Sequence, residues 1–391
     1  TPTRPTQIPL RLVGSEMCIR DSHMTNAWLD SMTYKDFIEK VMGLDVAVTR
    51  FADPVLASAG GMGCDVMSAY IAKQLGMYGL YPDAPVNPLN RHSFPGGNDG
   101  FARHFVKLLI PSAITGKNNF EDIMNNPINF NNLDREENKI RLRLSSNVID
   151  VHHTSKSVNV TYYKNNELTK INTKAVVMAS GGWVNKHIIS DLPQTHKDAY
   201  EQFNHAPMLV ANVALTNWRF LKKLGITAYQ WTGGFGFHTN IRKPMHVGNY
   251  KPDLDPDKPI TLTFYVSFEK TNQGLSAKEQ SRLGQYEMLG KSFMQYEREI
   301  REQMVRMFSS SGFDPKNDIA GIILNRWGHA YVTPTPGFFY TPEGDPGYAD
   351  IIKTKPFGRV SFGHSELRGY QHWGPAAAEG SRAVDQISEF I

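Results

Sequence analysis

The sequence predicts a mixed α/β or α+β fold of the kind found in enzymes. Three observations support this: segments with helical apolar spacing, segments with the period or composition of strands, and an ordinary globular composition. Hydrophobic residues make up 40% and charged residues 20% of the 391 residues. A chain of this length and composition is expected to bury a sizeable core in two or more packed units.

The charge pattern and the cysteines exclude several classes of protein. The formal net charge is +4, and acidic and basic residues are interleaved, so no basic face for nucleic acid is expected. No apolar run approaches the roughly 20 residues that span a bilayer. Cys18 and Cys64 are too few for a disulfide framework or a cysteine zinc site, and no metal site is expected. Cys64 lies among Ala, Gly and Met, which favours a buried thiol.

The first 22 residues are expected to be foreign to the natural protein. They have neither helical nor strand period, and they lack the order of regions of a signal peptide. The string LVGSEMCIRD, residues 12–21, matches the translation of a transposon-type sequencing adapter. The alternative is a natural disordered tail. We exclude residues 1–22 and expect the natural start upstream, which leaves a periplasmic or cytoplasmic, bacterial-type location open.

Three segments in the first third predict helices. Residues 31–48 have helical spacing, with Thr33 as N-cap. Residues 54–80 indicate a Gly-broken turn followed by a buried helix. After the turn FPGGNDG, the segment FARHFVKLLI predicts a helix capped by Asn98 or Asp99.

Residues 141–183 alternate with period two around a KNNE turn and predict three strands. The last, AVVMAS, is a continuous apolar run of the buried type. His152 and His153 are adjacent on an alternating strand, so their rings should face opposite sides and cannot chelate together.

The remaining residues predict further strands and helices. Residues 208–224 indicate a strand entering a short helix, 226–250 a loop or edge strand, and 260–268 an alternating strand. Residues 275–308 predict one long amphipathic helix or two in series, and 318–337 a strand entering a Pro-rich loop. Residues 358–390 predict a short strand, a loop and a helix packed through Ala and Gly.

The C-terminal segment has the pattern of a ligand site. A helix opening at WGPAAAEG directs free N–H groups and the positive end of its dipole toward whatever precedes it. Pro375 suits the first turn, and small residues such as Ala376 let a flat ligand approach the backbone. Glu366, at the end of the strand, is a candidate acceptor for ligand hydroxyls. The alternative is a helix closely packed against a strand.

This segment, GRVSFGHSE…GPAAAEGSRAV, resembles the C-terminal flavin motif of the monoamine oxidase and polyamine oxidase superfamily. In that motif a strand R-I-x-F-A-G-x-E leads to a helix E-G-A-x-x-S-G-x-R-A. The positions that match in type are Arg359, Phe362, Glu366, Gly380, Arg382 and Ala383. His364 and Pro375 stand where the family has glycine.

Other segments extend the resemblance from Tyr34 to Ile391. FPGGNDGFARHFVKLLIPSAI, VANVALTNWRFLKKLGI, GFDPKNDIAGIILNRWGHAY and FGRVSFGHSE are similar to the spermidine dehydrogenase-like group. The resemblance implies an FAD/NAD(P)-binding Rossmann-like domain in two parts, residues 23–200 and 316–391. A substrate domain of mixed sheet plus helices lies between them, at 201–315. The implied FAD contacts are Gly96, Gly97, Val148, Gly363, Glu366, Gly374 and Ala376.

One part of the family pattern is missing. The family begins with a strand and a G-x-G-x-x-G turn that holds the pyrophosphate, and nothing in residues 1–50 matches it. We therefore expect an N-terminal truncation that removes the first βαβ unit. Such a chain should bind FAD poorly, because the turn that neutralises the phosphates is absent.

The resemblance implies oxidation of an amine carbon–nitrogen bond, with hydride transfer to the flavin. Aromatic rings suit an alkylammonium substrate, because cation–π attraction contributes roughly 0.5–2 kcal/mol. Trp327 and His329 are the candidate catalytic residues. The candidate substrate contacts are Tyr229, Trp231, Tyr331 and Trp373. Core packing is the alternative for each aromatic residue, and a structural imidazole is the alternative for His329.

Other chemistries lack their motifs. No HExxH, Walker-type or G-x-S-x-G pattern occurs. Haem is found in the spermidine dehydrogenase-like group, but no Cys-x-x-Cys-His is present, so haem stays open, as does the electron acceptor. Two alternatives remain: a flavin-fold protein that binds a ligand or partner without catalysis through YQWTGGFGFH, and a flavin oxidoreductase acting on a non-amine substrate.

Overall fold

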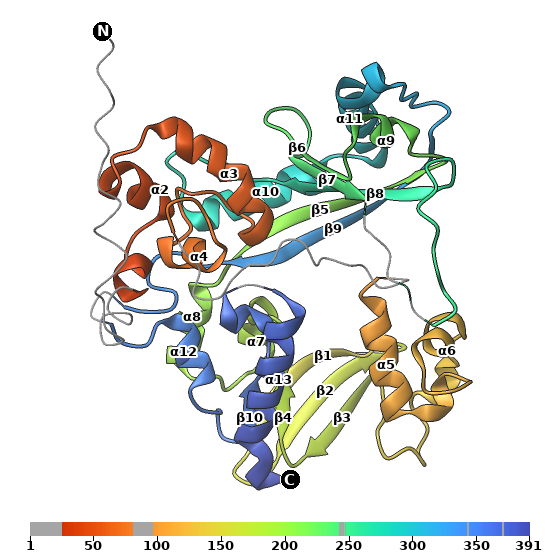
Figure 1. The fold of residues 1–391 in the computed structure, drawn as a ribbon. Helices are drawn as coiled ribbons and strands as arrows, with labels where there is room; N and C mark the ends of the chain where they lie inside the picture. The colour runs from red at the N-terminus through yellow and green to blue at the C-terminus, as the bar shows by residue number, and fades with distance from the viewer. Residues whose placement is uncertain (1–25, 81–96, 242–245, 247, 342–343, 370) are drawn as a thin grey trace.

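A computed structural model describes residues 26–80, 97–241, 246, 248–341, 344–369 and 371–391. They form helices and three β-sheets (Figure 1), which confirms the mixed helix-and-sheet class. Residues 1–22, including Cys18, and the predicted FAD contact Gly96 lie outside the described residues. No helix in the described ranges has the length and apolarity needed to cross a bilayer.

The first helices confirm the Thr33 cap and correct two boundaries. The Thr33 side chain accepts a hydrogen bond from Asp36 N at 3.1 Å and opens α2 (Tyr34–Asp36), which continues as the π-helical turn η2 (Phe37–Val41). The predicted helix 31–48 is then interrupted at Gly43, whose φ is +64°, a value that suits glycine.

The next helix, α3 (Val46–Gly60), is capped by Asp45 and contains Pro54 in its interior. The turn predicted from residue 54 therefore begins only after Gly60. The buried helix predicted after that turn is α4 (Ala69–Gln74).

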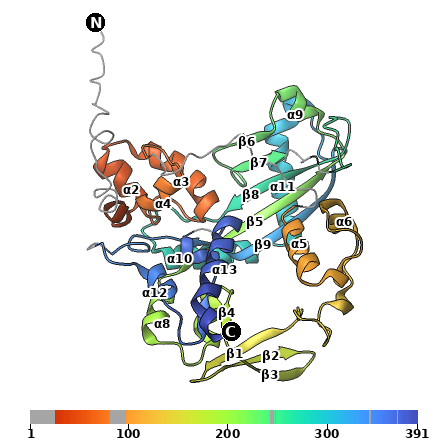
Figure 2. The same ribbon diagram turned by 60° about the horizontal axis from the view of Figure 1, so that its bottom comes forward.

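A second helical group precedes the three-stranded sheet in the chain (Figure 2). It contains α5 (Asp99–Leu109), α6 (Phe120–Asn125) and the short turns η4 (Pro111–Ala113) and η5 (Phe130–Asn132). Asn98 precedes α5, as predicted, although its side chain makes no capping hydrogen bond.

The period-two segment forms four strands rather than three. β1 (Asn147–His153), β2 (Val158–Lys164) and β3 (Glu167–Thr173) form an antiparallel sheet, and Asn165 and Asn166 adopt positive φ at the hairpin. β4 (Val176–Met178) leaves this sheet and pairs in parallel with β10 (Val360–Phe362). Helices α7 (Gly182–Ile188) and α8 (Gln194–Glu201) follow β4.

The largest sheet has five antiparallel strands in the order β6-β7-β8-β5-β9. Their bounds are β5 (Asn204–Leu215), β6 (Ala228–Gln230), β7 (His238–Ile241), β8 (Ile260–Ser267) and β9 (Ile319–Thr333). The short helix predicted after β5 is α9 (Arg219–Leu224), and β6 is the predicted edge strand.

Two helices in series cover this sheet, α10 (Ala277–Gly290) and α11 (Phe293–Phe308). Each begins with a capping box, Ser276 with Glu279 and Ser292 with Gln295. The second box explains why residues 275–308 form two helices: its reciprocal hydrogen bonds start a new helix in the middle of the segment.

The C-terminal segment folds as predicted into a strand, a loop and a helix. After α12 (Tyr348–Lys353) come β10, the turn η7 (Ser365–Arg368), α13 (Trp373–Ile387) and the final turn η8 (Ser388–Phe390). α13 lies along β10 and β4 in both views (Figures 1 and 2). A Cβ on Gly363 would lie 3.0 Å from the Cβ of Ala383, so the small residue permits this close packing. The division into two FAD-binding parts and a substrate domain stays a prediction.

Candidate active site

A fully buried carboxylate, Glu366, connects three distant parts of the chain. Its Oε1 accepts a hydrogen bond from the backbone N of Gly182, at the start of α7, at 2.6 Å. Its Oε2 lies 2.8 Å from Nε2 of His205, at the start of β5. Glu366 itself stands in η7, which begins three residues after the end of β10. The contacts therefore join the ends of β4 and β10 to the five-stranded sheet.

The indole of Trp183 lies at the centre of a group of histidines. It stacks on His329 of β9, with ring centroids 4.7 Å apart and planes 7° apart. His205 meets the indole edge-on at 4.5 Å, and His364 does so at 5.9 Å. We call these four residues together with Glu366 the Trp183–histidine cluster.

Two glycines let Trp183 adopt this position. A Cβ on Gly181 would lie 1.9 Å from Cζ3 of the Trp183 ring, and a Cβ on Gly182 would lie 2.2 Å from Cδ1 of Tyr200. Any larger residue would collide with an aromatic ring at both positions. The sequence Gly-Gly-Trp after β4 is thus required by packing at this site.

An irregularity in β9 places His329. Met208 of β5 pairs with Trp327, whereas Ala206 pairs with Tyr331, so β9 has two extra residues between these pairs. A β-bulge breaks the alternation of side chains and re-aims the residues within it. His329 lies inside this bulge and contacts Trp183.

Loss of water and neighbouring charge lower the pKa of the two outer histidines, His329 and His364. Loss of water lowers the pKa of His329, and the positive charge of His205 lowers it further. The same two causes lower the pKa of His364, while Glu366 acts in the opposite direction on both. The Nδ1 atom of His364 already accepts a hydrogen bond from Glu366 N at 3.3 Å, so His329 is the better placed of the two to accept a proton. Among the described residues, no three His, Cys, Asp or Glu side chains are arranged to hold a metal ion.

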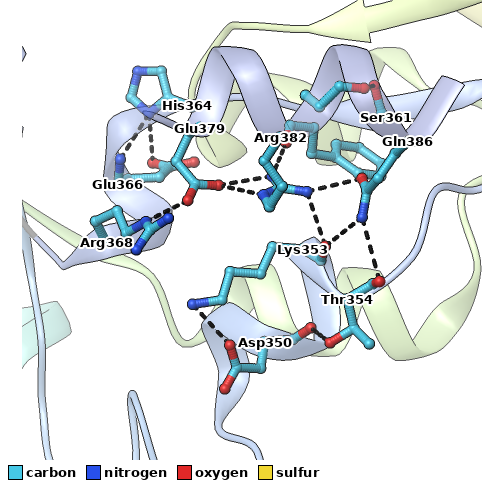
Figure 3. A network of polar contacts seen from close by, with 12 residues as sticks. Asp350, Lys353, Thr354, Ser361, His364, Glu366, Arg368, Glu379, Arg382 and Gln386 are labelled. Atoms are coloured by element: carbon cyan, nitrogen blue, oxygen red, sulfur yellow. Dashed lines mark hydrogen bonds and ion pairs between the residues drawn. The ribbon is translucent and has the colours of Figure 1, made fainter. Parts of the chain in front are cut away.

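A second buried carboxylate, Glu379 of α13, has a different environment (Figure 3). It forms ion pairs with Arg368 and with Arg382, whose Nε lies 2.8 Å from Glu379 Oε2. Arg382 also donates to the carbonyls of Phe362 and Lys353. Arg382, one of the positions that match the flavin motif, thus ties α13 to β10 and α12.

The start of α13 has room for a flat ligand. His372 precedes it without a side-chain cap, and Gly374 and Ala376 are exposed. A Cβ on Gly374 or Gly380 would meet nothing within 4 Å. An uncapped end of a 15-residue helix with small exposed residues fits the anionic or polar edge of a flavin.

The other predicted FAD contacts differ in accessibility. Gly97 has φ +79° and open space around it, and Val148 on β1 is 39% exposed. Gly363 is packed against α13, as described above. Both oxygens of Glu366 already accept a hydrogen bond or face an imidazole inside the protein. Its expected contact with ligand hydroxyls would have to use the remaining lone pairs.

The predicted catalytic residue Trp327 and the predicted substrate residues fall into separate places. Trp327 is 57% exposed on β9 and Tyr331 is half-buried farther along the same strand. Trp373 stacks on Phe101 of α5, with centroids 4.6 Å apart. Tyr229 and Trp231 lie at the edge strand β6, where they pack against Phe308 and Phe264. The structure does not bring these last two to the Trp183–histidine cluster, so their substrate role stays a prediction.

Reasoning from the sequence missed Trp183 and His205, and it noted His364 only as a departure from the family motif. The pair of glycines before Trp183 is the signal that was available. Consecutive glycines directly after a buried strand indicate that another group approaches the backbone closely. No local pattern pointed to His205, because its contacts with Glu366 and His329 are all long-range.

No protein-family model matches the chain, and no curated protein is similar to it in sequence. Several solved structures are similar to this chain in fold. Putrescine oxidase bound to putrescine aligns over 94% of this chain and 74% of that chain, with 14% identity and a TM-score of 0.57. Cyclohexylamine oxidase from Brevibacterium oxydans IH-35A aligns over 93% and 68%, with 14% identity and a TM-score of 0.51.

A putrescine oxidase variant aligns over 62% of this chain, with 16% identity and a TM-score of 0.45, and the chain spans only 48% of its length. The longer alignments, to putrescine oxidase and cyclohexylamine oxidase, show that this chain shares the fold of these amine oxidases.

Proposed function

We propose that this protein is an FAD-dependent enzyme that oxidises an alkyl amine, with polyamines such as spermidine as the substrate class. The observation that carries the proposal is the Trp183–His329 stack beside the buried Glu366–His205 pair, at the ends of β4 and β10. The amine oxidase fold and the resemblance of the C-terminal segment to a flavin motif support it.

The residues for holding FAD lie at the start of α13. Gly374 and Ala376 leave its free N–H groups accessible, and Gly97 offers an open approach at α5. When bound, FAD would supply the hydride acceptor for the amine carbon. Weak binding by this chain follows from the lack of a G-x-G-x-x-G turn in the sequence.

The chain's own residues suit an amine substrate. The indoles of Trp183 and Trp327 offer ring faces for an alkylammonium group. The imidazole of His329, whose pKa is lowered by loss of water, can take up the proton that such a group must lose before it is oxidised. Bound substrate would also displace water from the aromatic surface.

Titration of the protein with FAD, followed by anaerobic addition of spermidine, tests this proposal. We expect weak, saturable quenching of flavin fluorescence and then bleaching of the flavin absorption. Ala376→Glu should abolish FAD binding, because a carboxylate at the start of α13 would repel the cofactor. The matched control is Ser381→Glu, at an exposed position farther along the same helix.

Two results would contradict the proposal: no saturable FAD binding, or binding that Ala376→Glu leaves unchanged. A panel of cyclohexylamine, putrescine, spermidine and a non-amine alcohol would separate amine oxidation from other flavin chemistry. Tight stoichiometric binding of FAD by the 391-residue chain would contradict the expected weak binding.

A ligand-binding role without catalysis is the second candidate, and one observation favours it. A cavity of about 390 Å³ lies beside the aromatic segment, lined by residues that include Phe235, Phe268, Glu287 and Lys291. A folded protein that binds an amine at this cavity, takes up no FAD and leaves the amine unchanged would support this alternative.

A further inference from the structure

We infer that Pro207 of β5 and Gln285 of α10 are positioning residues for His329. Pro207 opens the bulge in β9, and Gln285 fixes the bulged backbone so that the His329 ring is held on Trp183. The effect on catalysis rests on the proposed function, whereas the effect on the position of the ring does not.

Pro207 lies opposite the bulge and is buried. The residues on either side of it pair with Tyr331 and Trp327, so this one residue faces the three residues between them in β9. Proline has no backbone N–H to donate to a neighbouring strand, and within a sheet it occurs at edges, at strand starts and at bulges. β5 is an interior strand of its sheet, and Pro207 lies inside it. We therefore attribute the bulge to Pro207.

Gln285 supplies a hydrogen bond to the bulged backbone. Its Nε2 donates to the carbonyl O of Gly328 at 2.9 Å. This oxygen belongs to the peptide unit that joins Gly328 to His329. A bulge disrupts the ladder locally, so the donor for this carbonyl comes from a helix outside the sheet. Gln285 therefore fixes the peptide unit that carries the His329 side chain.

Two further residues of α10 hold this helix close to the sheet. A Cβ on Gly284 would lie 2.8 Å from the carbonyl O of the residue after β8, so a larger residue would push α10 outward. The hydroxyl of Ser281 donates to the carbonyl O of His205. Ser281 and Gln285 are four residues apart and lie on the same face of the helix. This one face therefore contacts the backbone beside both His205 and His329.

The His329 ring depends on this support. It is exposed, and no side chain in the described part of the chain hydrogen-bonds to its nitrogens. Its position is set by the backbone of β9 and by the stack on Trp183, whose plane is 7° from that of the imidazole. If the peptide unit before His329 rotates, the imidazole leaves the indole face. Gln285 should therefore affect amine oxidation by acting through His329.

NMR of the protein with labelled histidines measures this arrangement without any cofactor. A ring stacked on an indole face is shielded, so the His329 ring signals should lie upfield of those of exposed His187. Gln285→Met keeps the length of the side chain but removes the donor, and the His329 signals should move downfield. Gln285→Lys, whose ammonium can donate to the same carbonyl, should restore them in part. The control is Arg282→Met, at an exposed position on the same helix.

His329 signals that stay in place in Gln285→Met would overturn the inference, even if the variant is less stable, and so would an equal shift in Arg282→Met. If Gln285→Met does not fold, Pro207→Ala decides. The restored N–H can pair with β9 and close the bulge, so the His329 signals should again move downfield. Unchanged signals in Pro207→Ala would overturn the inference.

Activity provides the link to the proposed function. In the FAD-loaded protein, kcat for an amine should fall about 10-fold in Gln285→Met, because a general base contributes roughly 100- to 10,000-fold and is here displaced rather than removed. KM should change little, and Gln285→Lys should recover part of the rate. If the His329 signals shift but no amine bleaches the flavin, the proposed function fails and the positioning role stands. If amines bleach the flavin at the native rate and the signals stay in place, the proposed function stands and the positioning role fails.

Discussion

The His205 ring lies 2.8 Å from the Glu366 carboxylate, and neither side chain is more than 3% exposed. The two residues meet at the point where the five-stranded sheet approaches the C-terminal segment.

Two replacements of Glu366 should show how much its contacts with Gly182 and His205 contribute to the free energy of unfolding. Glu366→Leu leaves the buried Gly182 N–H and His205 without an acceptor, and we expect a loss of about 1–3 kcal/mol in the free energy of unfolding. Glu366→Gln retains an acceptor for Gly182 and should lose less. Urea unfolding measures both, with exposed Glu302→Gln as the control. Equal stability of the Leu and native proteins would contradict these contacts.

The glycines before Trp183 should not tolerate alanine. In Gly182→Ala the new Cβ meets the buried Tyr200 ring, and overpacking of this kind costs about 1–3 kcal/mol. In Gly181→Ala the Trp183 ring must move, so the near-ultraviolet circular dichroism should change as well. Gly380→Ala, with open space inside α13, should instead stabilise the protein by about 0.5–1 kcal/mol. Equal stability of the three alanine variants would contradict this prediction.

The Glu379 ion pairs should be essential for the C-terminal helix. Glu379→Ala leaves two arginines facing a buried position, and we expect a loss of about 3 kcal/mol. Both arginine side chains retain some exposure, which places the cost at the lower end for a broken buried pair. Thermal unfolding compares this variant with exposed Glu389→Ala. A melting temperature like that of the control would show that the network is dispensable.

The free energy of unfolding should fall as the pH rises, because the buried Asp30 loses its proton. Burial raises its pKa from 3.8 to about 6, against the opposing hydrogen bonds from Tyr340 N and Phe339 N. The folded state therefore holds the proton more tightly than the unfolded state. Its contribution is complete below pH 4 and is lost as the pH passes through about 6, with a magnitude on the order of 3 kcal/mol.

Asp30→Asn tests this dependence, because an amide cannot ionise. Urea unfolding between pH 4 and pH 7 should show a smaller loss of stability with rising pH in the variant than in the native protein. Exposed Asp385→Asn is the control and should keep the native slope. An unchanged slope in Asp30→Asn would contradict the assignment.

Local sequence signals predicted most of the fold. The Thr33 cap was predicted because it acts on a neighbour three residues away. The Ser276 and Ser292 capping boxes act over the same short range, but they were not predicted from the sequence. β4 was grouped with the preceding strands, because alternation alone does not reveal which strand is its partner. That partner is β10, far along the chain.

The site was less predictable for the same reason. The small-residue start of α13 was recognised from Gly374 and Ala376, which form a local pattern. The contact of His205 with Glu366 depends on how two sheets meet. The placement of His329 depends on a β-bulge that cannot be predicted from the residue types in β9. Periodicity carries no information about such long-range geometry.

The hydrogen bond from Gly182 to Glu366 closes a loop of 184 residues, and the parallel pairing of β4 with β10 closes a similar one. Contacts so far apart in the sequence form slowly during folding, because the entropy of closing the loop is lost before the contact is made. The hairpins and helices between them can form earlier. The contacts of the Trp183–histidine cluster are therefore expected to form in the last phase of refolding, after most of the circular dichroism signal has returned.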